Sequence, residues 1–235
     1  MFKRLTLSLL TLAALQVVPS LLMAQEAVAA KPAPITYIAT GVDLRKCAFP
    51  FCGGFFVKAV NQPLTQCADG TWQKTCHAVV LNTEALGWTD EQRSAFADPF
   101  GRGQALVQGR LAAGEVQGIK TPVLTVASAW QAQALSKPAG TFYAVKSTGI
   151  VCITTPCPSL AATRLNSKAA PTNPDLDLSR TGASDEQIQA SGQALATTGI
   201  LTAGTLVPSF STDYTGKTRR GTRLIASEFY LPAKP

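Results

Sequence analysis

The chain has 235 residues, 46% of them hydrophobic, and a formal net charge of +7 at pH 7. This apolar fraction is sufficient for a folded core and excludes the intrinsically disordered class, which combines few apolar residues with a high net charge. The length permits one large domain or two small ones.

The first 29 residues have the pattern of a secretory signal peptide. Lys3 and Arg4 form a positively charged start, an uncharged and mostly apolar run extends to Met23, and small residues follow. This order is typical of exported proteins. We predict cleavage after Ala29, with Ala24 as the alternative, and a periplasmic or secreted protein with no membrane span after cleavage. The run is also about long enough for an uncleaved membrane anchor, which is the other interpretation.

The next hundred or so residues have the pattern of five strands and one short helix. Runs rich in β-branched and aromatic residues predict strands at 35–44, 54–61, 77–82, 104–112 and 122–132. The segment from Thr89 to Gln92 matches a capping box, so the helix should begin there. Pro and Gly then interrupt the pattern at 134–140, which indicates a linker.

The rest of the chain repeats this order. Cys47 and Cys52, with four residues between them, match Cys152 and Cys157, and the capping box returns at Ser184. Further matches occur in the same order: Asn61 with Asn166, Leu81 with Leu176, residues 109–116 (GRLAAGEV) with 199–206 (GILTAGTL), and Trp130 with Phe229.

Two such copies predict a protein of the α+β class. We expect two tandem, related, β-rich domains, each with about five strands and one short helix, and both stabilised by disulfides. They would cover residues 33–133 and 141–233, with the linker at 134–140.

The six cysteines favour disulfides, because an even number in an exported chain indicates bonding before metal binding. The second copy contains only one pair, which predicts the bonds Cys47–Cys52, Cys67–Cys76 and Cys152–Cys157. A crossed bond between Cys47 and Cys76 is one alternative. A four-cysteine zinc site is another, although zinc-binding cysteines usually lie two to four residues apart. We expect no metal and no cofactor.

No catalytic constellation is recognisable in the sequence. His77 is the only histidine, and no serine lies in a nucleophile-elbow motif. The acids at 90–91 and 185–186 are explained as helix starts. These observations favour a protein without enzymatic activity.

Basic residues cluster near the C-terminus, at Lys217, Arg219, Arg220 and Arg223. We interpret them as a solvated loop between two strands. A patch for anionic surfaces or polysaccharide is the alternative. Export argues against a nucleic-acid partner.

Four phenylalanines lie in or beside the first short disulfide loop. Phe55 or Phe56 should face the core, whereas Phe49 and Phe51 could be core residues or exposed anchors for a partner. Gly53 and Gly54 would leave room for the backbone of that partner. The binding hypothesis therefore places Phe49, Phe51, Gly53 and Gly54 on the contact surface.

The segments CAFPFCGGFFVKAVN, CADGTWQKTC and GQALVQGRL resemble an uncharacterised family of exported bacterial proteins, and GIVCITTPCPSLAATRLN and LIASEFYLP resemble its usual second half. The resemblance implies two related domains outside the cytoplasm, and because the function of the family is unknown it assigns no catalytic residues. We expect an exported, non-catalytic binding or structural protein whose partner is a protein, a glycan or an envelope component. A secreted protease inhibitor and an extracytoplasmic hydrolase are the alternatives.

Overall fold

The computed structural model describes residues 33–153, 156–213 and 215–233, so the predicted signal peptide and its two candidate cleavage sites lie outside the described residues. Strands dominate, with two α-helices and one short 3-10 helix in this part of the chain. In chain order the elements are β1 (Ile35–Val42), β2 (Phe55–Ala59), β3 (Thr65–Gln66), β4 (Trp72–Gln73), β5 (Cys76–Ala78), β6 (Val80–Asn82), η1 (Glu84–Leu86), α1 (Asp90–Gly101), β7 (Ala105–Val116), β8 (Ile119–Ala132), β9 (Thr141–Ser147), β10 (Leu160–Arg164), β11 (Asp175–Asp177), α2 (Asp185–Ala196), β12 (Ile200–Thr212) and β13 (Thr218–Pro232).

One sheet of eleven strands runs through both halves of the chain. Its hydrogen-bonded order is β10-β9-β12-β13-β8-β7-β1-β2-β5, and all of these neighbours are antiparallel. Two short strands join it in parallel, β6 beside β8 and β11 beside β13. Strands β3 and β4 form a separate small hairpin.

The prediction of an α+β protein with two tandem domains is therefore wrong. The protein is mostly β, and residues 33–235 form one compact unit. The two halves join where the ends of β8 and β13 pair, through Trp130 with Pro232, Gln131 with Leu231 and Ala132 with Tyr230. Each strand covers backbone groups that the other would leave exposed at a sheet edge. The matches between the two copies show which segments are alike. They do not show which strand of one copy pairs with a strand of the other, so they could not predict the pairing of β8 with β13.

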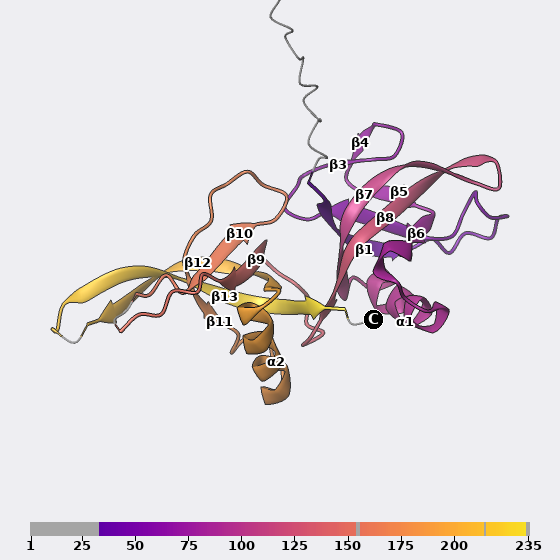
Figure 1. Cartoon of the computed structure of the whole chain (residues 1–235). Coiled ribbons are helices and arrows are strands. Elements are labelled where there is room, and N and C mark those ends of the chain that lie inside the picture. The colour runs from indigo at the N-terminus through magenta and orange to yellow at the C-terminus, as the bar shows by residue number, and fades with distance from the viewer. Residues whose placement is uncertain (1–32, 154–155, 214, 234–235) are drawn as a thin grey trace, which may run out of the picture. The chain divides into compact units, whose positions relative to one another are not determined.

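The same pairing pattern nevertheless occurs in each half (Figure 1). The first strand of each half, β1 or β9, lies between a short antiparallel partner and a long strand, β7 or β12. That long strand pairs with the next one, β8 or β13, which also holds a short parallel strand.

The strand register corrects one part of the sequence alignment. A β-bulge interrupts the pairing of β7 with β8 between Gln108 and Gly109, and another interrupts that of β12 with β13 between Ala203 and Gly204. A Cβ atom on Gly109 would lie 2.1 Å from the Thr125 carbonyl oxygen, and one on Gly204 would lie 2.3 Å from that of Ile225. Gly109 therefore corresponds to Gly204, whereas the sequence match had paired it with Gly199.

Both capping boxes form as the sequence predicts. The side chains of Thr89 and Ser184 accept hydrogen bonds from the backbone three residues ahead, and the side chains of Gln92 and Gln187 accept from the capping residues. Helix α1 lies against β1 and β7, and α2 against β9 and β12. Each helix covers one part of the sheet (Figure 1).

Three disulfides join Cys47 to Cys52, Cys67 to Cys76 and Cys152 to Cys157. All six cysteines are therefore bonded, which rules out both the crossed bond from Cys47 to Cys76 and the four-cysteine zinc site.

Candidate functional site

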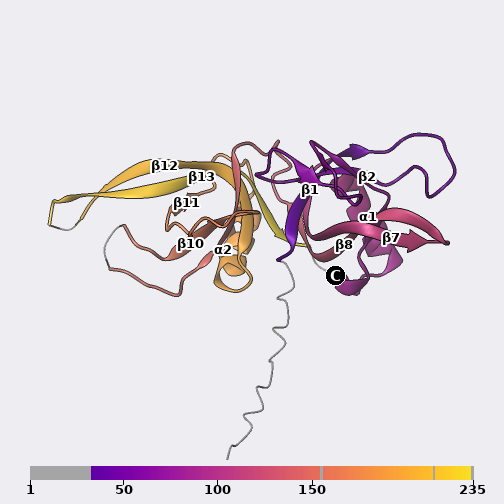
Figure 2. The ribbon, with the colours of Figure 1, turned by 90° about the horizontal axis from the view of Figure 1, so that it is seen from above.

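The loop that joins β1 to β2, residues 43–54, carries the predicted binding residues. The disulfide between Cys47 and Cys52 closes its outer part. Cys52 is buried, but Phe49 is 50% exposed and Phe51 is 65% exposed. The loop projects away from its two strands (Figure 2). The bond thus lies partly inside the fold while both rings face the solvent.

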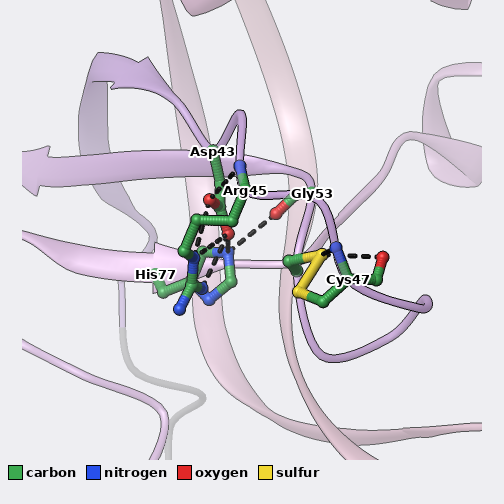
Figure 3. Close-up of a disulfide and its surroundings, with 6 residues drawn as sticks. Asp43, Arg45, Cys47, Gly53 and His77 are labelled. Carbon is green, nitrogen blue, oxygen red and sulfur yellow. Dashed lines mark hydrogen bonds and ion pairs between the residues drawn. A yellow bond between two sulfur atoms is a disulfide. The ribbon is translucent and has the colours of Figure 1, made fainter.

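A buried carboxylate lies at the base of this 43–54 loop (Figure 3). The Arg45 guanidinium donates from Nε and Nη2 to the two oxygens of Asp43, over 2.8 and 2.7 Å. The Asp43 backbone N–H also donates to the Gly54 carbonyl, which closes the base of the loop. The hydrogen bonds from the Arg45 side chain hold the pKa of Asp43 well below its usual range. Asp43 therefore stays ionised at neutral pH.

His77, on the neighbouring strand β5, supports the same loop. Its Nε2 lies 2.7 Å from the Gly53 carbonyl oxygen and 3.2 Å from an Asp43 oxygen. Since a carbonyl only accepts hydrogen bonds, Nε2 carries the hydrogen in this contact. The ring stacks on Phe56 at a centroid distance of 5.2 Å. His77 thus links the first and last parts of the loop, which is a structural role.

The two glycines of the predicted site have different surroundings. Both have positive φ, +89° at Gly53 and +74° at Gly54. A Cβ atom on Gly54 would lie 2.2 Å from the Ala78 carbonyl oxygen, whereas one on Gly53 would have no neighbour within 4 Å. Gly54 therefore makes room for the chain's own backbone, and only Gly53 faces open space.

The other two phenylalanines lie inside the fold or against His77. Phe55 packs edge-on against the buried ring of Phe100, with centroids 5.1 Å apart. Phe56 contacts His77. Of the four clustered rings, Phe49 and Phe51 are therefore the exposed pair.

Sequence reasoning did not identify Asp43 or Arg45 as part of this site. The available signal was an aspartate two residues before an arginine at the end of a predicted strand, where an aspartate side chain commonly bonds to the backbone two residues on. The Arg45 N–H does donate to Asp43 in this way, over 3.1 Å. The contribution of His77 could not be read from spacing, because 32 residues separate it from Arg45 in the sequence.

The arrangement holds the base of the loop through an ion pair, hydrogen bonds and a disulfide. Nε2 of His77 is occupied by the loop backbone and Asp43. Within the described residues, no group of three histidines, cysteines or acids could hold a metal ion. In the same part of the chain, no helix is long and apolar enough to cross a membrane.

A family model for a domain of unknown function, DUF6748, matches residues 36–235. The chain belongs to this family. The match includes the 43–54 loop and both halves of the sheet, so the family domain corresponds to the whole compact unit and not to one half of it. Neither the curated proteins nor the solved structures contain a match to the chain.

Proposed function

We propose that this chain is an exported, non-catalytic binding protein that uses the 43–54 loop as its contact surface. The predicted signal peptide supports export. Three disulfides are consistent with an oxidising compartment such as the periplasm or the extracellular space. We also propose that the protein is bacterial, as its resemblance to exported bacterial proteins implies.

The observation that carries this proposal is the exposure of Phe49 and Phe51 on a loop whose base is held in place. Aromatic side chains supply a large apolar area, and this class of residue dominates binding hot spots. The disulfide, the Asp43–Arg45 pair and the His77 contact restrict the loop before binding. Little conformational entropy is then lost when a partner binds.

The partner we propose is a protein or glycan of the cell envelope. A flat ring can stack on a sugar or enter an apolar pocket of a protein, and Gly53 leaves space beside the rings. In the second disulfide loop Thr154 and Pro156 occupy the positions that correspond to Phe49 and Phe51, so we propose that this binding belongs to the first half alone.

We also propose that the two halves arose by duplication. The recurring strand pairing, the paired bulge glycines and the two capping boxes support this. In this account the duplicated units merged into one sheet, and their loops then diverged in sequence.

The test is the double substitution Phe49→Ala/Phe51→Ala, with the buried Phe100→Ala as the control from the core. The probes are purified peptidoglycan and detergent-extracted envelope proteins, both immobilised. We expect the loop variant to lose binding to one of them while its melting temperature stays near that of the wild type. The control should melt at a clearly lower temperature, because truncation of a packed phenylalanine costs about 3–5 kcal/mol.

Two outcomes would contradict the proposal. One is a loop variant as unstable as the control, which would make both rings part of the core. The other is unchanged binding of the loop variant to both probes, or no binding of the wild type to either. Inhibition of a protease by the wild type but not by the loop variant would favour the inhibitor alternative.

A further inference from the structure

The second disulfide loop exposes aliphatic side chains. Three residues around Cys152 form an aliphatic tip, which we define as Ile150, Val151 and Ile153. Their exposed fractions are 50%, 94% and 100%. All three side chains are purely apolar, so their exposure to water is unfavourable. Such a cluster usually marks an interaction surface.

Basic residues lie beside this tip on β13. Pro156, in the same disulfide loop, packs against Gly221, where an added Cβ atom would lie 3.1 Å from the Pro156 Cβ. Arg219 and Arg223 lie two residues before and after Gly221, and therefore on the same face of the strand. A hollow between loop and strand is lined by Pro156, Asn173 and Arg220, among others.

Phe210 adds an exposed ring to this basic strand end. It pairs across β12 and β13 with Arg220, so both side chains share a face, and it is 68% exposed. The β12–β13 hairpin and the loop before β10 lie together at one end of the second half (Figures 1 and 2). Phe210 and Arg220 therefore lie on the face of the hairpin opposite to Arg219 and Arg223, so basic side chains surround this strand end on both faces.

Cations outnumber acids here. Lys217, Arg219, Arg220 and Arg223 contribute four positive charges. Three acids lie beside them. Asp213 forms an ion pair with Arg219 at 3.0 Å, and Asp175 lies opposite Arg223 in the pairing of β11 with β13. The third is Asp177, whose pKa is lowered mainly by a hydrogen bond from Ser179 and to a smaller extent by Arg223. Among the described residues, Arg220 and Arg223 form no ion pair within 4.0 Å. The surface is therefore complementary to an anionic partner.

We propose that the aliphatic tip and the basic strand end dock together on the surface of an anionic lipid bilayer. Aliphatic side chains with cations around them are typical of residues that enter the headgroup region, since apolar burial and attraction to anionic lipids act together there. The aliphatic tip itself contains neither an aromatic residue nor arginine, the residues that dominate protein hot spots, and valine is under-represented there. This inference goes beyond the proposed function, which concerns the first half.

The test uses large unilamellar vesicles of phosphatidylcholine, with and without phosphatidylglycerol, and the purified exported protein. The aliphatic variant is Val151→Ser/Ile153→Ser. The charge variant is Arg220→Gln/Arg223→Gln, and its matched control is Arg110→Gln/Lys120→Gln on the β7–β8 hairpin, which lowers the net charge equally. Co-sedimentation measures the partition coefficient.

We expect the wild type to bind the anionic vesicles in preference to the neutral ones, and to bind them less tightly as salt is raised. The charge variant should bind at least about tenfold more weakly, since each cation near an anionic surface changes the affinity roughly fivefold. The aliphatic variant should also bind more weakly, because it removes the apolar side chains that enter the headgroup region. The control charge variant and Phe49→Ala/Phe51→Ala should bind nearly as well as the wild type. Val151→Trp should show blue-shifted emission that brominated lipids quench.

Absence of binding to the anionic vesicles would overturn the proposal, as would equal binding to both kinds of vesicle. Equal losses in the two charge variants would show an effect of net charge alone. An aliphatic variant that binds as the wild type does would show that the tip stays in water, which also contradicts the proposal. Thermal melts of every variant check that the fold is intact.

Discussion

At the base of the 43–54 loop, the Asp43 carboxylate is buried and accepts hydrogen bonds from both the side chain and the backbone of Arg45. These contacts favour the charged form of Asp43 and lower its pKa. A carboxyl group with a lowered pKa stabilises the folded state at pH values above its unfolded pKa. That stabilisation is lost as the pH falls through the folded pKa.

We therefore expect Asp43→Asn to lower the melting temperature at pH 7. The difference from the wild type should shrink as the pH falls below about 4, the ordinary pKa of an aspartate. Thermal melts at a series of pH values measure this difference. Asp98→Asn, which breaks the exposed pair with Arg102, is the matched control and should have a much smaller effect. An Asp43→Asn effect that does not change with pH would refute the electrostatic explanation.

The two glycines of the loop show how one residue type serves two purposes. Gly54 lies against the backbone of Ala78 and Val79, so its lack of a side chain is needed for packing between β2 and β5. Gly53 has the same left-handed backbone but no close neighbour. The sequence shows only that both residues are glycine, and the distinction depends on what folds against them.

At the scale of elements, the two helices begin with equivalent capping boxes but differ in one contact. The Gln187 side chain accepts from the Ser184 backbone and also donates from Nε2 to the Gln133 carbonyl. It therefore attaches α2 to the segment that joins the two halves. Gln92 makes the equivalent capping bond to Thr89 at the start of α1.

This difference predicts that Gln187→Ala is more destabilising than Gln92→Ala, by about 1 kcal/mol, the usual net contribution of one hydrogen bond. Each substitution also removes the side-chain hydrogen bond to the capping residue, so this loss is common to both variants. Urea unfolding of the two single variants measures the difference. Equal free energies of unfolding would mean that the contact with Gln133 contributes nothing.

At the scale of the whole molecule, two asparagines join the halves reciprocally. The Asn61 amide group donates to the carbonyls of Phe142 and Leu165 and accepts from the Phe142 N–H. The Asn166 amide group donates to the carbonyls of Thr36 and Val60 and accepts from the Thr36 N–H. Both asparagines have positive φ, of 60° and 52°, which asparagine tolerates better than most residues.

Replacement of either asparagine by glycine keeps the backbone conformation and removes three hydrogen bonds. We expect Asn61→Gly and Asn166→Gly each to cost about 3 kcal/mol, at roughly 1 kcal/mol for each bond. Asn173→Gly, which removes a single bond to the Leu160 carbonyl, is the control. Urea unfolding measures these costs.

If Asn61→Gly and Asn166→Gly lower the free energy of unfolding no more than Asn173→Gly does, the two asparagines do not hold the halves together.

Because one sheet spans both halves, calorimetry of the wild type should show a single unfolding transition. Two separate transitions would mean that the halves unfold independently.

A buried glutamate fixes the segment between the halves. The Glu228 carboxylate is fully buried and accepts from the backbone N–H groups of Gln133, Ala134 and Ser136. The sequence predicted a linker at 134–140 from its Pro and Gly residues. The structure shows that part of this segment is bonded to β13. Nothing near Glu228 in the sequence indicates this, because the donors lie more than 90 residues away.

The sequence alone determined the local features of this protein. Capping boxes depend on side chains three residues apart and therefore follow from spacing. The disulfide pairing was predicted from the repeat, whose second copy has a single cysteine pair, and a crossed bond was the alternative. Most of β7 and β8 follows from runs of β-forming residues. The interpretation of the basic cluster as a loop was wrong for Arg219, Arg220 and Arg223, which lie in β13. The exposure of Phe49 and Phe51 was left open, since a ring beside a disulfide can face either way.

Only the tertiary structure decided how the halves combine. The pairing of β8 with β13, the reciprocal asparagines and the bonds to Glu228 all join segments about 80 to 130 residues apart. Backbone hydrogen bonds form with any residue except proline as donor, so residue types encode such pairing only weakly. Two copies of similar sequence can form two sheets or one, and here the strand ends satisfy each other's backbone groups in a single sheet.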